Sequence, residues 1–318
     1  MKKIGVLVFL ALALAAYGQQ AENSADQGAP QGTQPTNASF PIERVQMPTR
    51  SDLLCAGFVT KEAVPDNHFV AAGLQTPSTT KYENGDLIYL AGGGYQTGQE
   101  YTIIRELRDP NRYELFYGQH AMLHAMGKPY SELAKIRVID TRSKMAVAEV
   151  EQSCDPVNPG DVAIPYVQKE HIAFHPPTRF DRFLPPNGKA SGRIVMARDF
   201  DSELGTGMKV YINVGENQGV KTGDYFRAVR LYSADLHDPV DSLSFKASTM
   251  EDTQMRPPSM DPNWATKTRG PVIHVEDLPR RAVGEIVIIS TTPTTATGMI
   301  VFAMEDVHVG DGVELDPQ

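Results

Sequence analysis

The chain has 318 residues, a formal net charge of −9, 41% hydrophobic residues and two cysteines. A chain of this length has room for two ordinary domains. The acidic balance, with no cluster of Lys and Arg beyond the first residues, argues against the basic face that nucleic-acid binding needs, and we expect no nucleic-acid partner.

The first 18 residues have the pattern of a secretory signal peptide. Lys2 and Lys3 precede an apolar run over residues 4–16, which ends in small residues. An uncleaved membrane anchor is the alternative, but the run is short for a bilayer span. We therefore expect export to the periplasm or cell surface, with no transmembrane segment after cleavage. Residues 19–40 are rich in Gln, Ala, Ser, Gly, Pro, Thr and Asn, which predicts a flexible spacer.

Residues 41–174 are predicted to form a first β domain. Apolar and polar residues alternate between glycines, which favours antiparallel strands near residues 53–59, 85–90 and 97–105. A brief helix is expected around residues 119–126, within a longer excursion of the chain.

Residues 175–191 are rich in proline and predict a semi-rigid connector to a second β domain, residues 192–318. An insertion over residues 235–279 interrupts the strand pattern and carries the only tryptophan. A loop of this length is either functional or disordered.

The strongest signal is an internal repeat. Residues 133–161 and 283–311 align without a gap, which is the signature of a duplicated structural unit. The identical pairs are Ile136/Ile286, Ile139/Ile289, Thr141/Thr291, Ala146/Ala296, Val157/Val307, Gly160/Gly310 and Asp161/Asp311.

Weaker echoes extend the repeat upstream of this stretch. They match residues 57–60 with 192–195, 87–90 with 209–212, and 97–105 with 222–230. We therefore predict an all-β fold of two duplicated, small, antiparallel β-barrel-like domains, with helix only in loops.

The repeated Gly and Asp residues are interpreted as structural turns. Glycine supplies positive φ, and an Asp side chain bonds nearby backbone amides. The residues concerned are Gly98, Gly160, Asp161, Gly223, Asp224, Gly310 and Asp311. A catalytic carboxylate pair would have to converge, and turns at separate corners give no reason for that. No nucleophile elbow or other catalytic constellation is recognisable, so we expect a non-enzyme.

Cys55 and Cys154 both belong to the exported part of the chain, where an even cysteine count favours a disulfide. The bond would tie the start of the first domain to the stretch before its Gly-Asp turn. Two buried thiols are the alternative. Met304 stands at the place of Cys154 in the second repeat, so the disulfide belongs to the first domain only.

Two further features suggest ligands. The pairs His120/His124 and His171/His175 have the i, i+4 spacing of metal ligands on a helix, although surface or structural roles are the alternative. A group of tyrosines in the first domain is interpreted as cross-strand packing, or else as a stacking platform for a glycan or protein. They are Tyr82, Tyr89, Tyr95, Tyr101, Tyr113, Tyr117 and Tyr130.

The motifs at residues 85–89, 101–110, 133–139 and 158–165 resemble the β-domain that trails LysM modules in bacterial cell-envelope proteins. The second half, with residues 212–226 and Gly310-Asp311, is similar to the C-terminal domain of flagellar assembly protein T. The resemblance implies non-catalytic scaffolding, with an envelope protein or a peptidoglycan-associated molecule as the partner. The chain itself has no LysM module.

The sequence thus predicts a non-catalytic, exported cell-envelope scaffold or interaction protein without a cofactor. The alternative is a metal- or glycan-binding envelope protein.

Overall fold

The computed structural model describes residues 45–75, 78–111, 113–142, 144–173, 181–183, 185–230 and 279–316. The predicted signal peptide and spacer lie outside the described residues, as does the 235–279 insertion except for its last residue. Among the described residues, no helix is both long and apolar enough to cross a membrane.

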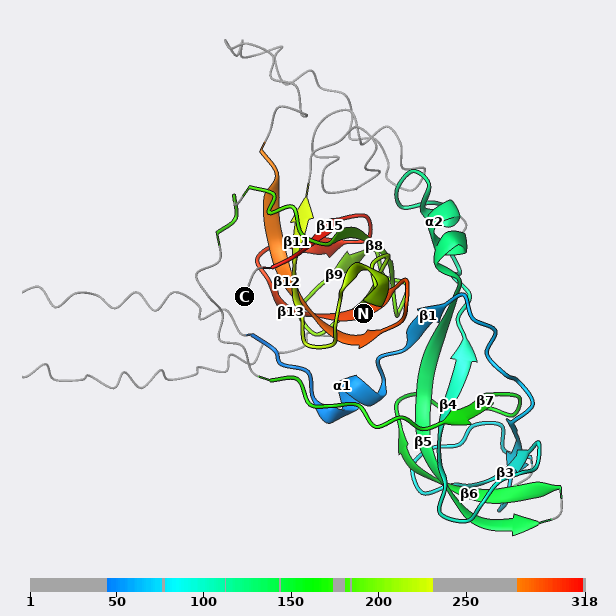
Figure 1. Ribbon diagram of the computed structural model, residues 1–318. Helices are drawn as coiled ribbons and strands as arrows, with labels where there is room; N and C mark the ends of the chain where they lie inside the picture. Colours follow the sequence, from blue (N-terminus) through cyan, green and yellow to red (C-terminus); the bar gives the residue numbers. More distant parts are fainter. Residues whose placement is uncertain are drawn as a thin grey trace, which may run out of the picture. The chain divides into compact units, whose positions relative to one another are not determined.

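The first barrel is a closed, antiparallel sheet of six strands (Figure 1). The strand order is β5-β4-β7-β2-β3-β6, and pairing of β5 with β6 closes the ring. The strands are β2 (Phe69–Gly73), β3 (Leu87–Ala91), β4 (Glu100–Glu106), β5 (Lys128–Arg142), β6 (Met145–Ser153) and β7 (Val162–Pro165). A further short strand, β1 (Phe58–Thr60), pairs with the start of β5.

The second barrel has the strand order β10-β13-β12-β11-β15-β8 and is also closed. Its strands are β8 (Ser191–Ala197), β10 (Lys209–Ile212), β11 (Tyr225–Arg230), β12 (Arg281–Thr291), β13 (Ala296–Ala303) and β15 (Gly312–Leu315). A separate two-stranded ladder joins β9 (Glu203–Leu204) to β14 (Val307–His308). A 3-10 turn, η1 (Glu216–Gln218), follows β10.

The two barrels have the same topology, so the all-β prediction with two barrel-like domains is confirmed. In order, β5-β4-β7-β2-β3-β6 correspond to β12-β11-β15-β8-β10-β13. The β-bulges match as well: β5 shifts register at Lys135/Ile136, and β12 shifts at Glu285/Ile286. Ile136 and Ile286 are both fully buried.

One matched pair in the predicted repeat is wrong. Residues 192–195 lie in β8, but the equivalent strand of the first barrel is β2, not the stretch 57–60. The backbone shows this directly: the N–H of Gly160 donates to the carbonyl of Val70, and the N–H of Gly310 donates to that of Ile194. The two Gly-led stretches look alike, but β1 lies outside the six-strand ring of the first barrel.

The expected strand over residues 53–59 is also wrong in its first half. Residues Arg50–Leu54 form a helix, α1, and only β1 is extended. The helix begins at a capping box, in which Thr49 and Asp52 each bond the other's backbone N–H. The second expected helix is confirmed as α2 (Gln119–Met126).

The hydrophobic core is divided unequally between the barrels. The first barrel encloses its own cluster, which includes Ile88, Ile103 and Val138. The core of the second barrel also takes in Val59, which lies on β1, and Phe116, which precedes α2. The first half of the chain therefore contributes side chains to the core of the second barrel.

A third cluster lies on the outer face of the second barrel. Leu53 and Ala56 cover Val287, Met299 and Val301, which point away from the barrel interior. We call residues 45–60, which contain α1 and β1, the covering segment.

Candidate functional site

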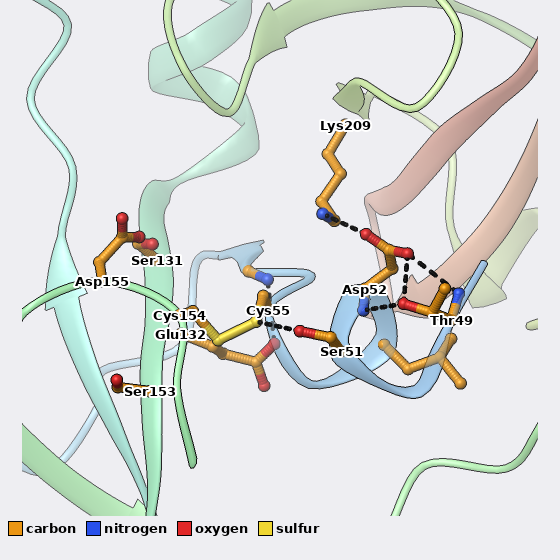
Figure 2. Close-up of a disulfide and its surroundings, with 12 residues drawn as sticks. Thr49, Ser51, Asp52, Cys55, Ser131, Glu132, Ser153, Cys154, Asp155 and Lys209 are labelled. Atoms are coloured by element: carbon orange, nitrogen blue, oxygen red, sulfur yellow. Dashed lines mark hydrogen bonds and ion pairs between the residues drawn. A yellow bond between two sulfur atoms is a disulfide. The ribbon is translucent and has the colours of Figure 1, made fainter. Parts of the chain in front are cut away.

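The predicted disulfide is present and anchors the covering segment to the first barrel. Cys55 ends α1, and Cys154 follows β6, with 5.8 Å between their Cα atoms and 99 positions between them in sequence. Figure 2 shows the bond beside Ser51 and Asp52 of the helix. Because Cys55 is buried, the bond fixes the end of α1 where it meets both barrels.

Gly57 lies next to the disulfide and connects to both barrels. Its N–H donates to Glu132 Oε2 on β5 over 2.9 Å, and its carbonyl accepts from Thr297 Oγ1 on β13 over 2.9 Å. Its φ is +68°, and a Cβ there would lie 2.4 Å from Tyr211 Oη and 2.7 Å from the Tyr130 carbonyl oxygen. Only glycine meets both requirements, positive φ and close approach.

An ion pair joins the start of α1 to the second barrel. Lys209 Nζ lies 2.9 Å from Asp52 Oδ1, and Figure 2 shows the pair. Burial alone would raise the pKa of Asp52, but the hydrogen bonds from Thr49 and the charge of Lys209 outweigh it and hold that pKa below its usual value.

The Gly-Asp residues singled out in the sequence lie at turns. Gly98, Gly160, Gly223 and Gly310 all have positive φ. Asp161 accepts from the Asn158 N–H over 2.6 Å, Asp224 from the Lys221 N–H over 2.8 Å, and Asp311 from the His308 N–H over 2.8 Å. Each carboxylate bonds an amide of its own turn.

Sequence reasoning missed the arginine partners of two of these aspartates. Arg105 Nε and Nη2 donate to the two oxygens of Asp161 over 2.8 and 2.7 Å. Arg230 repeats the fork on Asp311 over 2.9 and 2.8 Å. Each arginine also donates to a backbone carbonyl: Arg105 to that of Pro156, and Arg230 to that of Asp306. The internal repeat contained a signal for these pairs, because it aligns Arg105 near the end of β4 with Arg230 at the end of β11.

The histidine pairs gain little support as ligands. His120 and His124 lie on α2, and His120 Nδ1 is 3.8 Å from Glu114 Oε1. His171 lies in the stretch after β7, and His175 lies outside the described residues. Within the described ranges, no three His, Cys, Asp or Glu side chains gather closely enough to hold a metal ion.

The tyrosines divide between packing and exposure. Four are buried in or beside the first barrel: Tyr82, Tyr95, Tyr101 and Tyr130. Burial raises the pKa of Tyr95, with a further contribution from Tyr101. Tyr113 and Tyr117 are 79% exposed, in the loop before α2. The packing interpretation therefore describes the buried tyrosines and does not describe these two.

A row of apolar side chains lies on the outer face of the first barrel. Phe69 pairs with Ala91 across β2 and β3, and Ala91 pairs with Met145 across β3 and β6. Directly paired residues of an antiparallel sheet project from the same face. The alternate residues, such as Leu90, point into the core, so this row points outward.

We call this surface the outer patch and define it as Phe69, Tyr89, Ala91, Ile139 and Met145. Phe69, Ile139 and Met145 are 38%, 41% and 44% exposed, and the other two are partly exposed. Contiguous exposed apolar side chains mark interaction sites more often than scattered ones do. The sequence predicts these residues to be part of the barrel strands. It does not show which outward-facing side chains another segment covers, so the outer patch was missed.

Neither a scan against protein-family models nor a search of curated proteins finds a match for this chain. The resemblance to the β-domain that trails LysM modules, and to flagellar assembly protein T, therefore stays a prediction.

Proposed function

We propose that the protein is a non-catalytic, exported interaction and scaffold protein of the cell envelope, and that the outer patch docks a protein partner. The exposure of Phe69, Ile139 and Met145 on one closed barrel is the observation that carries this proposal. The six-strand ring itself has no free strand edge, so a partner on the outer patch has to be recognised through side chains.

The composition of the outer patch favours a protein as its occupant. Phe, Tyr, Met and Arg are enriched at protein interfaces relative to the rest of the surface. The outer patch combines the first three, and Arg142 borders it because it pairs directly with Met145. The Arg142 side chain is 77% exposed, and its Nη2 forms an ion pair with Asp140 Oδ2 at 2.6 Å. The border of the outer patch is therefore polar. An apolar centre with a polar rim is the usual anatomy of such an interface.

Support for export comes from the leader-like first 18 residues and from the bonded cysteines. Disulfides persist in oxidising compartments and are rare in the reducing cytosol. The resemblance to envelope domains belongs to the same proposal, in which a peptidoglycan-associated protein is one form of the partner.

Site-specific photocrosslinking tests the proposal in cells that export the full chain. A photoreactive residue replaces Met145 in one variant and Phe183 in a matched control, because Phe183 is an exposed aromatic residue outside the outer patch. We expect a discrete crosslinked product from position 145 and none of that size from position 183. Adding Phe69→Glu and Ile139→Glu should remove the product, because two buried, unpaired charges oppose docking.

Equal crosslinking at both positions, or a product that survives the two glutamates, would contradict the proposal. A product with twice the mass of the chain would identify a second copy as the occupant and would also contradict a partner protein. Recovery of unprocessed chain in the cytosolic fraction would refute export.

A further inference from the structure

A small cavity lies where α1, β5, β6 and the stretch after β7 meet. Its volume is about 140 Å³. The lining residues are Arg50, Leu53, Leu54, Lys135, Gln152, Tyr166, Gln168, Lys169 and His171. None of them belongs to the outer patch.

The polar part of this lining is dominated by hydrogen-bond donors. Arg50, Lys135 and Lys169 are cationic, and Gln152 and Gln168 supply amides, while no Asp or Glu lines the cavity. A cavity with positive charge at its wall and no carboxylate favours an anionic ligand over a cation.

The two lysines are fixed in place by carboxylates that stand outside the cavity. Lys135 Nζ lies 2.7 Å from Glu100 and 3.0 Å from Glu151. Lys169 Nζ donates to buried Glu132 and, over 2.8 Å, to the carbonyl of Leu53. An ammonium group has three N–H donors. Two acceptors on each lysine leave one N–H for a ligand.

Lys135 stays charged in this setting. Burial alone would lower the pKa of Lys135, but the hydrogen bonds and charges of Glu100 and Glu151 outweigh it, and the pKa lies above its usual value. The positive charge is therefore present throughout the neutral pH range.

The other walls are apolar and aromatic. Leu53 and Leu54 are 3% and 7% exposed and form part of the wall from α1. Tyr166 holds Lys135 Nζ 4.7 Å from the centre of its ring. A cavity of about 150 Å³ accepts one benzene ring in a well-studied protein. The cavity is open to solvent, so it suits one face of a six-membered ring whose remaining substituents lie at the opening.

We propose that this cavity binds an acidic sugar residue, a pyranose ring that carries a carboxylate. The carboxylate meets Arg50 and the free N–H groups of Lys135 and Lys169. The hydroxyls meet the amides of Gln152 and Gln168, and the carbon face of the ring meets the apolar wall. A bare phosphate would leave that wall unused, and an aromatic acid would leave the amides unused.

This inference goes beyond the partner-binding function and does not depend on it, because it uses a different surface. Calorimetric titration of the oxidised full chain tests it with four probes: glucuronate, glucose, benzoate and inorganic phosphate. We expect glucuronate to bind at least about tenfold more tightly than each of the other three, since charge and ring are both needed.

Two exposed or partly exposed residues allow the site to be perturbed without changing either lysine. Arg50→Gln removes one charge from the cavity, and Tyr166→Leu removes the aromatic wall. Each should weaken glucuronate binding about tenfold. Arg108→Gln, in the stretch after β4, removes the same charge from an exposed position outside the cavity and should leave glucuronate binding unchanged.

The proposal is overturned if glucuronate shows no saturable binding, or if glucose, benzoate or phosphate binds as tightly. It is also overturned if neither Arg50→Gln nor Tyr166→Leu weakens binding, because the sugar would then sit elsewhere. Loss of crosslinking at the outer patch leaves these results unaffected, so the two proposals fail separately.

Discussion

The outer faces of the two barrels differ far more than their interiors. In the second barrel, Tyr225, Val287 and Met299 form an apolar outer cluster under the covering segment. The first barrel has Glu100, Arg137 and Glu149 at the equivalent positions, as shown by the pairings of β4 with β5 and β11 with β12.

The charged face of the first barrel is organised as an ion-pair network. Arg137 contacts Glu100 over 2.9 Å and Glu151 over 2.6 Å, and Lys135 contacts the same two carboxylates. The comparison teaches that the residues inside each barrel specify the fold. The residues on the outside differ between the two barrels according to what packs against them. At these three pairs of positions, apolar residues appear where the covering segment lies, and charged residues appear on the first barrel.

The repeated Arg–Asp fork gives the sharpest test of this difference, because the same bonds lie in two environments. The Arg230 and Asp311 side chains are both 1% exposed, whereas Arg105 is 37% exposed. Removing one partner of a buried ion pair leaves the other charge buried without a partner. We expect Arg230→Ala to lower the free energy of unfolding by about 3–5 kcal/mol, and Arg105→Ala to lower it by about 1 kcal/mol because water screens that pair.

Urea denaturation of both variants measures these losses. Arg230→Lys is the control that keeps the charge but not the fork. Equal losses at positions 105 and 230 would show that burial does not set the strength of the two forks.

The disulfide is the next largest difference between the barrels, since only the first has one. Replacing both cysteines, Cys55→Ser with Cys154→Ser, should lower the free energy of unfolding by about 2–4 kcal/mol, because the bond restricts a long loop of the unfolded chain. Thermal unfolding with and without a reductant measures the loss in the native protein. An unchanged midpoint after complete reduction would contradict this role for the bond.

Gly57 tests the covering segment itself. Gly57→Ala should lower the free energy of unfolding by about 2–3 kcal/mol, since it adds overlap with Tyr211 and Tyr130 to the strain of positive φ. The matched control is Gly85→Ala, where φ is +85° and nothing lies within 4 Å of the new Cβ. The control carries strain alone and should cost about 1 kcal/mol. A control that costs as much as Gly57→Ala would rule out the close approach as the cause.

The smallest expected effect concerns pH. The hydrogen bond from Lys135, helped by the charges of Lys135 and Arg137 and opposed by burial, holds the pKa of Glu100 below its usual value. A carboxylate whose pKa is lower in the folded state stabilises the fold above its unfolded pKa of about 4.3 and loses that contribution as pH falls. Glu100→Gln should therefore flatten the acid side of the stability profile.

Chemical denaturation across the acid range measures the slope, with Glu62→Gln as an exposed-loop control for the loss of one negative charge. An identical slope in the wild type and Glu100→Gln would show that Lys135 and Arg137 do not act on the proton equilibrium of Glu100.

The barrel topology was readable in the sequence because its signals are local. Ile136 and Ile286 mark equivalent core positions, and Gly160 and Gly310 mark equivalent turns, at one fixed offset. The brief helix α2 was also readable, since glycines border it on both sides. Each of these features is decided by a few neighbouring residues.

The covering segment was not readable in the same way. Its apolar stretch before Gly57 suits a strand or a short helix, and the choice rests on the Thr49–Asp52 capping box and on burial against β12 and β13. The cavity beside Tyr166 has the same origin, because its walls come from four stretches that only tertiary contacts bring together. Contacts between distant parts of a chain leave no periodic pattern.

The position of the covering segment constrains how a newly made polypeptide matures. The ribosome releases Leu53 and Ala56 early, yet their contacts, Met299 and Val301, are among the last residues to be synthesised. During that interval the short apolar stretch lacks the β12 and β13 side chains that it packs against in the folded protein. A holding chaperone would protect it from aggregation. The N-terminal half therefore reaches its final state only when translation of the C-terminal half is complete.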